Sequence, residues 1–166
     1  MRIEQRRRCM VPIDPPATAE QLSAFLSRPM RPLRGLLHAD RLCQSAPGLF
    51  DYVSRPYGVA GWTLQPHVRL QAQWQEEALH LRQLESRVDG LGEWQQRLHF
   101  GLEAWLTPMD TSLRAEALVW AEVPTAAVVM AGPVLNLGLQ QLLDRLERRC
   151  QNGLRRRAQG WLARNV

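Results

Sequence analysis

A run of alternating apolar and polar residues between His67 and Val123 constrains the fold of this chain more than any other feature. A period of two is typical of β-strands that have one buried face and one face in water. Short turns, such as Glu76-Glu77, separate the rows, and strands joined by short turns form antiparallel sheets. The inward apolar members are Val68, Leu70, Ala72, Trp74, Leu79, Leu81, Leu98, Phe100, Leu102, Ala104, Leu106, Leu113, Ala115, Ala117 and Val119.

The period changes to that of an α-helix after Gly132-Pro133. Proline suits a first helical turn, so we predict that a C-terminal helix of about 30 residues begins there. Its apolar stripe needs a partner of matching size, which only the apolar face of the sheet offers. The sequence therefore predicts an α+β fold in which a curved antiparallel sheet grips a long C-terminal helix. The stripe consists of Leu135, Leu139, Leu142, Leu143, Leu146, Cys150, Leu154 and Trp161.

The region before the alternating rows predicts a short helix and a hairpin. Thr18 and Gln21 have the spacing of a capping box, so we expect a helix over residues 18–27. Strands are expected over Leu36–Cys43 and Leu49–Val53, on either side of a Pro-Gly turn. Between the last two rows we expect a four-residue loop, which would place Glu103 opposite Arg114.

The length of 166 residues is that of one domain. We divide the chain into a basic N-terminal segment, residues 1–17, and a single domain, residues 18–166. All 21 basic residues are arginines, which excludes enzymes that depend on a Schiff-base, Walker-type or kinase-type lysine. The uncharged stretch of 21 residues over 123–143 is long enough to span a bilayer, but Pro124 and Gly132-Pro133 interrupt it, so we predict no membrane-spanning helix.

No catalytic or metal-binding pattern is present in the sequence. The four histidines occur in no HxH or HExxH spacing, and there is no Gly-x-Ser-x-Gly motif. We therefore predict no catalytic residue, no metal ligand and no cofactor, which favours a binding protein over an enzyme, with a cyclase-like or hydrolase-like activity left open. Cys9, Cys43 and Cys150 are odd in number and widely separated, as expected for a reducing, cytoplasmic environment.

Six short segments carry a resemblance to known proteins: Phe25–Pro29, Leu36–Leu42, Gly48–Tyr52, Leu64–Val68, Leu102–Pro108 and Pro133–Leu135. In these segments the chain resembles an uncharacterised domain-of-unknown-function family of cyanobacteria and chloroplasts. The arrangement of sheet and helix resembles the helix-grip, START-like superfamily of ligand-binding and cyclase-like proteins. The resemblance implies a sheet that holds the C-terminal helix over a cavity, and it implies no catalytic residue.

The first functional hypothesis is a non-enzymatic module that binds a hydrophobic small molecule, such as a lipid, a pigment or an isoprenoid, between sheet and helix. The same inward side chains would equally fill a solid core. The residues expected to line the cavity are Leu70, Trp74, Leu81, Phe100, Leu102, Leu142 and Leu146.

The alternative is a photosynthesis-related assembly or scaffold factor. It would dock on an acidic protein or an anionic membrane surface, at which the chain would be peripheral, through an arginine-rich helix face. Trp105 and Trp120 share the outward sheet face, where they would form a partner surface or be covered by a terminal segment. That face carries charges of both signs, so nucleic acid is not an expected partner. The arginines are Arg145, Arg148, Arg149, Arg155 and Arg156.

Overall fold

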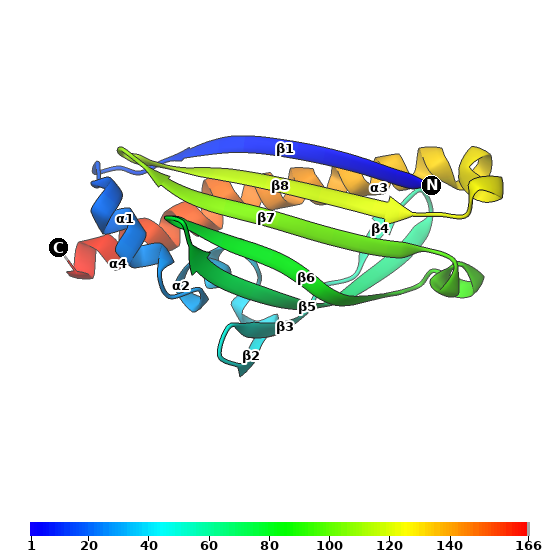
Figure 1. Cartoon of the computed structure of the whole chain (residues 1–166), viewed down its shortest axis with the longest axis horizontal. Coiled ribbons are helices and arrows are strands. Elements are labelled where there is room, and N and C mark those ends of the chain that lie inside the picture. Colours follow the sequence, from blue (N-terminus) through cyan, green and yellow to red (C-terminus); the bar gives the residue numbers. More distant parts are fainter. Residues whose placement is uncertain (166) are drawn as a thin grey trace.

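The computed structural model describes residues 1–165, which form a curved eight-stranded antiparallel sheet around a long C-terminal helix (Figure 1). The strand order is β1-β8-β7-β6-β5-β3-β2, and β4 pairs with the start of β5. The predicted α+β fold is confirmed. The strands are β1 (Arg2–Pro12), β2 (Leu42–Ala46), β3 (Leu49–Val53), β4 (Tyr57–Val59), β5 (Trp62–Gln75), β6 (Ala78–Asp89), β7 (His99–Met109) and β8 (Ser112–Glu122).

The register between β7 and β8 differs from the expected one. Met109 pairs with Ser112, so the turn contains two residues and not four. Glu103 therefore lies opposite Leu118 and not opposite Arg114. The apolar alternation is unchanged by this shift of four residues, because an even shift keeps every side chain on its own face of the sheet. The pattern therefore predicted the faces and left the register open.

Helix α1 (Ala19–Leu26) confirms the prediction made from its capping box. The Gln21 backbone N–H donates to Oγ1 of Thr18 at 3.1 Å, and the Thr18 N–H donates to Oε1 of Gln21 at 2.9 Å. These two bonds satisfy backbone donors that the first turn of a helix leaves unpaired.

The strand predicted over Leu36–Cys43 is wrong. The chain forms helix α2 (Met30–Leu36), then a short 3₁₀ turn, and enters β2 only at Leu42. Pro29 and Pro32 favour this helix, because they occupy its N-cap and first turn, where a missing N–H costs no hydrogen bond. The second strand of the predicted hairpin is present as β3.

The N-terminal segment is part of the sheet. Residues 2–12 form β1, the edge strand that pairs with β8 from Arg2–Glu122 to Pro12–Ser112. Its more buried residues alternate with exposed ones and include Ile3, Cys9 and Val11. Because Arg7 is one of the inward residues, the alternation of β1 is hidden behind a run of arginines in the sequence.

The C-terminal helix consists of α3 (Val128–Arg149), a π-helical turn (Cys150–Leu154) and α4 (Arg155–Asn165). It begins before the predicted start, so Pro133 lies inside α3. The carbonyl that loses its donor to this proline is that of Val129, at the exposed start of the helix, where the Val129 side chain is 87% exposed. Water can therefore replace the missing intrahelical bond.

The helical segment Thr125–Asn165 includes a stretch that is long and apolar enough, by composition, to cross a membrane. Only 22% of that stretch is buried in the structure. Its buried members include Leu135, Leu139 and Leu143, which pack with the inward residues of β8.

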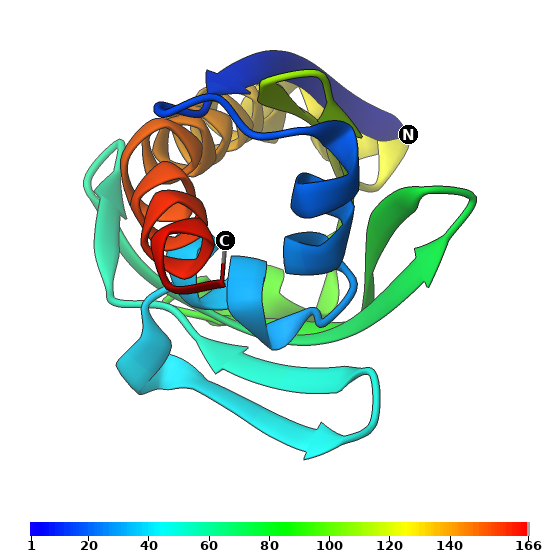
Figure 2. The same ribbon diagram turned by 90° about the vertical axis from the view of Figure 1, so that its left-hand side faces the viewer.

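Helices α1 and α2 close one end of the curved sheet (Figure 2). They pack against α4 and the π-helical turn, and the core at this end includes Phe25, Leu33 and Leu154. The interior is therefore filled by helices at this end and bordered by α3 along the rest of its length (Figures 1 and 2).

Candidate functional site

A cavity of about 800 Å³ lies between α3 and the concave face of the sheet. Cavities that hold small molecules occupy about 300–1,000 Å³ and have mostly apolar walls. Here the wall is formed by inward side chains of β5 to β8, by α2 and by α3, and most of these side chains are apolar. The interior is therefore hollow in the region where the sequence left open a choice between cavity and core.

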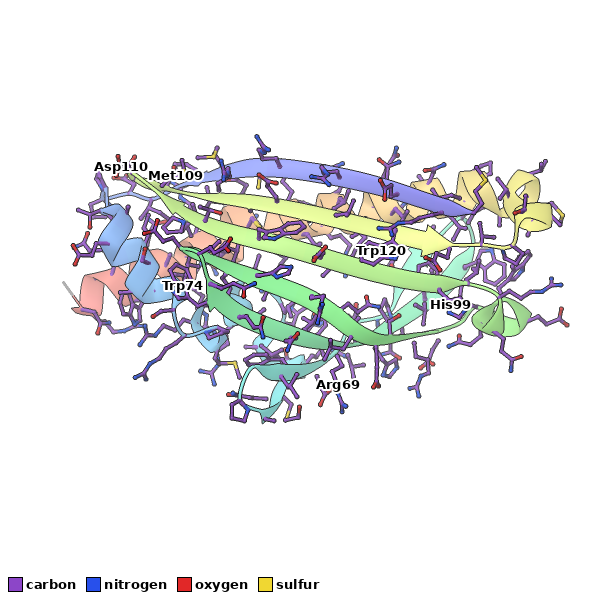
Figure 3. All side chains as sticks on the ribbon, viewed as in Figure 1. Arg69, Trp74, His99, Met109, Asp110 and Trp120 are labelled. Atoms are coloured by element: carbon purple, nitrogen blue, oxygen red, sulfur yellow. The ribbon has the colours of Figure 1, made fainter. Side chains whose placement is uncertain are left out.

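Six of the seven predicted lining residues lie on the wall of this cavity: Leu70, Leu81, Phe100, Leu102, Leu142 and Leu146. Trp74 is not on the wall. It lies at the end of β5 beside α1 and packs against the core (Figure 3). Its inward direction agrees with the alternation, but at this end α1 and α2 occupy the interior.

Part of the cavity wall comes from a region that the sequence did not point to. Helix α2 and the two residues that follow it line the cavity with Leu33, Leu36, Leu37 and His38. Leu36, Leu37 and His38 were missed because their segment was predicted as a strand, and Leu33 lies just before that segment, where no element was predicted. The signal was present in the i, i+3 and i+4 spacing of the three leucines, which is typical of one helix face. The region after β3 adds Ser54 and Tyr57.

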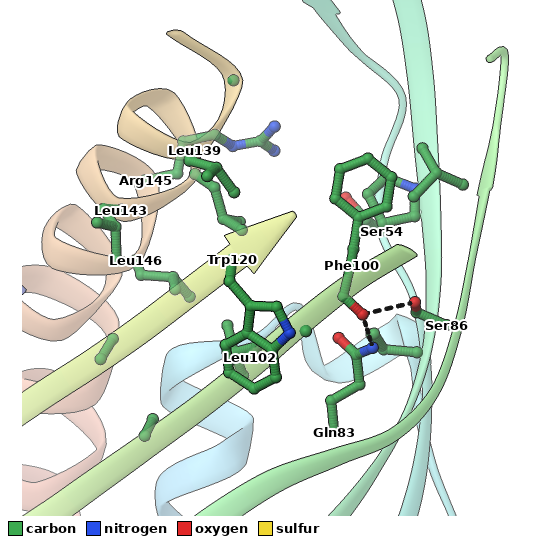
Figure 4. Close-up of a pocket in the computed structure, with 18 of the residues that line it drawn as sticks. Ser54, Gln83, Ser86, Phe100, Leu102, Trp120, Leu139, Leu143, Arg145 and Leu146 are labelled. Carbon is green, nitrogen blue, oxygen red and sulfur yellow. Dashed lines mark hydrogen bonds between the residues drawn. The ribbon is translucent and has the colours of Figure 1, made fainter. Parts of the chain in front are cut away.

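Two polar side chains bridge a separation between β6 and β7. The two strands pair only from Leu79 to Arg82 on β6. Beyond this point, Gln83 Nε2 and Ser86 Oγ both donate to the carbonyl oxygen of Phe100, at 2.6 and 3.3 Å (Figure 4). These side chains replace ladder hydrogen bonds, and all three residues line the cavity.

The predicted arginine face is divided between the cavity and the surface. Arg145, Arg148 and Arg149 line the cavity. Arg149 donates to the carbonyl oxygens of Leu36 and Leu37, at 3.3 and 2.9 Å, and so satisfies acceptors at the end of α2.

The remaining arginines of that face lie nearer to solvent. Arg156 is exposed and Arg155 is half-buried, and Arg148 is exposed although it also borders the cavity. The division has a geometric reason, because α3 packs against β1 and β8 and also against α2 and β4. Residues at the edge of its apolar stripe therefore face the interior.

The environment of His38 and Tyr57 is apolar and electropositive. Burial lowers the pKa of His38, and the charges of Arg149, Arg55 and Arg145 lower it further, against an opposing effect of Asp40. Burial raises the pKa of Tyr57, which the charge of Arg145 opposes. The Arg145 guanidinium lies over the Tyr57 ring, 4.5 Å from its centroid.

Polar contacts join β1 to the C-terminal helix along one side of the cavity. Gln5 Nε2 donates to Oδ1 of Asn136 at 3.1 Å, and Gln151 Nε2 donates to the carbonyl oxygen of Met10 at 2.8 Å. Arg7 lies between these contacts and forms ion pairs with Asp144 and Glu147. This series of contacts closes the side of the cavity that faces β1.

The thiols of Cys9 and Cys150 meet at the same junction. A hydrogen bond from the Cys150 thiol lowers the pKa of Cys9, and this interaction together with burial raises the pKa of Cys150. Both cysteines line the cavity, whereas Cys43 is exposed.

Trp105 and Trp120, the predicted aromatic partner surface, are each half-buried, and Trp120 also borders the cavity (Figure 4). Trp105 stacks on His80 of the neighbouring strand, with ring centroids 5.3 Å apart and an interplanar angle of 6°. Trp120 lies across Gly101, and the guanidinium of Arg2 stands 4.3 Å from its ring centroid. Arg2 of the N-terminal strand therefore covers part of Trp120, whereas Trp105 packs on His80 of β6.

Within residues 1–165 no group of three or more His, Cys, Asp or Glu side chains is arranged to hold a metal ion. The two acidic residues that border the cavity are both paired. Glu147 lies 3.3 Å from Arg7, and Glu116 lies on the outer face 3.0 Å from Arg8. The site thus offers a long apolar wall with arginines at its border.

Solved structures similar to this chain share its fold. A conserved protein from Geobacillus kaustophilus has a TM-score of 0.54 at 12% identity, over 98% of this chain and 97% of its own. Norcoclaurine synthase from Thalictrum flavum, in complex with dopamine and hydroxybenzaldehyde, has a TM-score of 0.51 at 14% identity, over 89% and 86%. Ara h 8.0201 has a TM-score of 0.50 at 11% identity, over 99% and 100%.

No protein-family model and no curated protein matches the sequence. The resemblance to the family of cyanobacteria and chloroplasts therefore stays a prediction. At the identities of the similar structures the common feature is the fold alone. The chain has the START-like helix-grip fold that its sequence predicts.

Proposed function

We propose that this protein binds a hydrophobic small molecule, such as a lipid, a pigment or an isoprenoid, between the sheet and the C-terminal helix, and does not transform it. The observation that carries the proposal is the cavity of about 800 Å³ with its mostly apolar wall. Packed interiors contain few voids larger than a water molecule, because an empty space forfeits contacts on all sides. A bound apolar molecule would restore those contacts.

Two further observations bear on whether the bound molecule is transformed. The acidic residues at the cavity border, Glu116 and Glu147, are engaged by Arg8 and Arg7, so neither is an unpaired carboxylate in the structure of residues 1–165. A structure with the same fold, norcoclaurine synthase, is an enzyme in complex with two small molecules. That example supports small-molecule binding by the fold and keeps an enzymatic function as the competing proposal.

A cavity-filling variant tests the proposal. Ala117 faces the cavity from β8, and Leu118 faces outward from the next position. Ala117→Phe should fill part of the space, keep the unfolding midpoint close to that of the wild type and weaken binding of an apolar fluorescent probe by about tenfold. Leu118→Phe is the matched control and should bind the probe as the wild type does.

Native mass spectrometry of the freshly purified protein gives a second measurement. We expect a retained apolar molecule that organic extraction removes, after which the probe binds. A folded wild-type protein that retains no molecule and binds no probe would overturn the proposal.

The docking function is the second candidate. Its support is that Arg148 and Arg156 are exposed, and that within residues 1–165 neither forms a salt bridge with an acidic residue. Replacing both with Glu should abolish salt-sensitive binding to vesicles that contain anionic lipid. Arg82→Glu, on the exposed sheet face, is the control. The resemblance to a family of cyanobacteria and chloroplasts makes a photosynthetic assembly the first protein partner to test.

A further inference from the structure

The geometry points to a ligand of one chemical class: an amphiphile whose anionic head, a carboxylate or a phosphate, contacts Arg145 while its apolar tail lies along α3. This inference rests on the proposed function and adds the ligand class and the residue that recognises it. The argument uses the position of Arg145, the charges around it and the shape of the wall.

Arg145 is a half-buried cation that has no acidic partner within residues 1–165. It projects from α3 at the edge of the cavity, next to the apolar residues Leu139 and Leu146 (Figure 4). Its guanidinium rests on the Tyr57 ring, and no carboxylate lies within 4.0 Å of it in the part of the chain that the structure describes. Stacking leaves the edge of the guanidinium and its N–H donors available for an anion.

The other charged groups of the wall do not neutralise this position. Glu147 is taken by Arg7, at 3.3 Å. Arg149 donates to the carbonyl oxygens of Leu36 and Leu37. Because these acceptors carry no net charge, they do not neutralise the positive charge of Arg149. Arg148 adds a third cation from the same helix. Burial is the largest cause of the lowered pKa of His38, and the charges of Arg149, Arg55 and Arg145 lower it further against an opposing effect of Asp40, which agrees with positive charge at this border.

The wall beyond Arg145 suits an elongated tail. Residues of α3 line the cavity from Met130 to Leu146, a length of about 24 Å at the helical rise of 1.5 Å per residue. Leu142 lies on this length of α3, and Phe100 and Leu102 of β7 line the cavity opposite it. A charged head at one end and an apolar tail along the rest would pair the cation and cover the apolar wall at the same time.

The test compares three ligands with the same sixteen-carbon chain: palmitate, hexadecyl phosphate and hexadecanol, each added below its solubility limit to the delipidated protein. We expect the wild type to bind at least one of the two anions about tenfold more tightly than the alcohol, because a hydrogen bond to a charged group strengthens binding by that order. Arg145→Gln should lose this preference and bind hexadecanol unchanged. Arg145→Lys should retain part of it, and Arg156→Gln, away from the cavity, should retain all of it.

The outcomes separate this inference from the proposed function. Equal binding of all three ligands by the wild type, or a preference that survives in Arg145→Gln, overturns the anionic head and leaves the apolar cavity in place. Failure of a folded protein to bind any of the three overturns both. A preference for palmitate alone or for hexadecyl phosphate alone supports the inference and identifies the head as a carboxylate or a phosphate.

Discussion

Gly35 and Gly153 bring α2 and the C-terminal helix into contact backbone to backbone. A Cβ atom built on Gly153 would lie 2.2 Å from the carbonyl oxygen of Gly35, and one on Gly35 would lie 2.7 Å from the Cα of Leu154. No side chain fits at either position. The contact matters for the cavity, because Leu33 and Leu36 of the same short helix form part of its wall.

We predict that Gly153→Ala destabilises the protein by about 1–3 kcal/mol, because the added methyl group meets backbone that cannot move aside. Gly160→Ala, two helical turns later, is the control. Its nearest neighbour is the Arg164 side chain at 3.6 Å, so it should gain about 0.5–1 kcal/mol from the higher helix propensity of alanine. Urea unfolding measures both. Equal stabilisation by the two substitutions would show that the helices do not touch at Gly153.

The turn between β5 and β6 holds two glutamates in the left-handed region, with φ values of 51° for Glu76 and 59° for Glu77. Two positive φ values define a turn that favours Asn-Gly. We expect the double substitution Glu76→Asn, Glu77→Gly to raise the free energy of unfolding by about 1 kcal/mol. The double alanine variant removes the charges and keeps the backbone strain, so its free energy of unfolding should rise far less. A rise as large as that of the Asn-Gly variant would show that the effect comes from charge and not from the backbone.

The pKa of His38 predicts a pH dependence of stability. Because the folded state holds this pKa below its ordinary value, the unfolded chain takes up the proton first as the pH falls. Stability should therefore decrease from about pH 6.5 downward, until the folded-state pKa is passed. His38→Gln should show a shallower decrease, and the profiles should run parallel above about pH 7.5. Identical slopes in the acid range would contradict the lowered pKa.

The three cysteines should differ in their rates of alkylation. Cys43 is exposed and should react first with iodoacetamide; Cys9, half-buried with a lowered pKa, should follow; and Cys150, buried with a raised pKa, should react last. Peptide mass spectrometry of timed samples measures the order, and the unfolded protein should show similar rates at all three sites. Labelling of native Cys150 as fast as that of Cys43 would show that β1 and the helix are not joined as described.

The sequence alone determined the faces of the sheet and the apolar stripe of the helix. Leu70, Phe100 and Leu142 could be placed toward the interior, because a strand repeats every two residues and a helix every 3.6. These periodicities are local, so the alternation of apolar and polar residues in the sequence shows directly which face is buried. They are also unchanged by an even shift of register, which is why Glu103 was assigned the wrong partner while its face was correct.

Only the tertiary structure decided which inward side chains surround a cavity. Trp74 and Phe100 follow the same alternation, yet α1 and α2 occupy the interior beside Trp74 and leave it hollow beside Phe100. The assignment of Arg145 to the cavity border likewise depends on β4, which brings Tyr57 beneath its guanidinium. The physical reason is that periodicity reports the direction of a side chain, whereas the space it meets is set by elements distant in the chain.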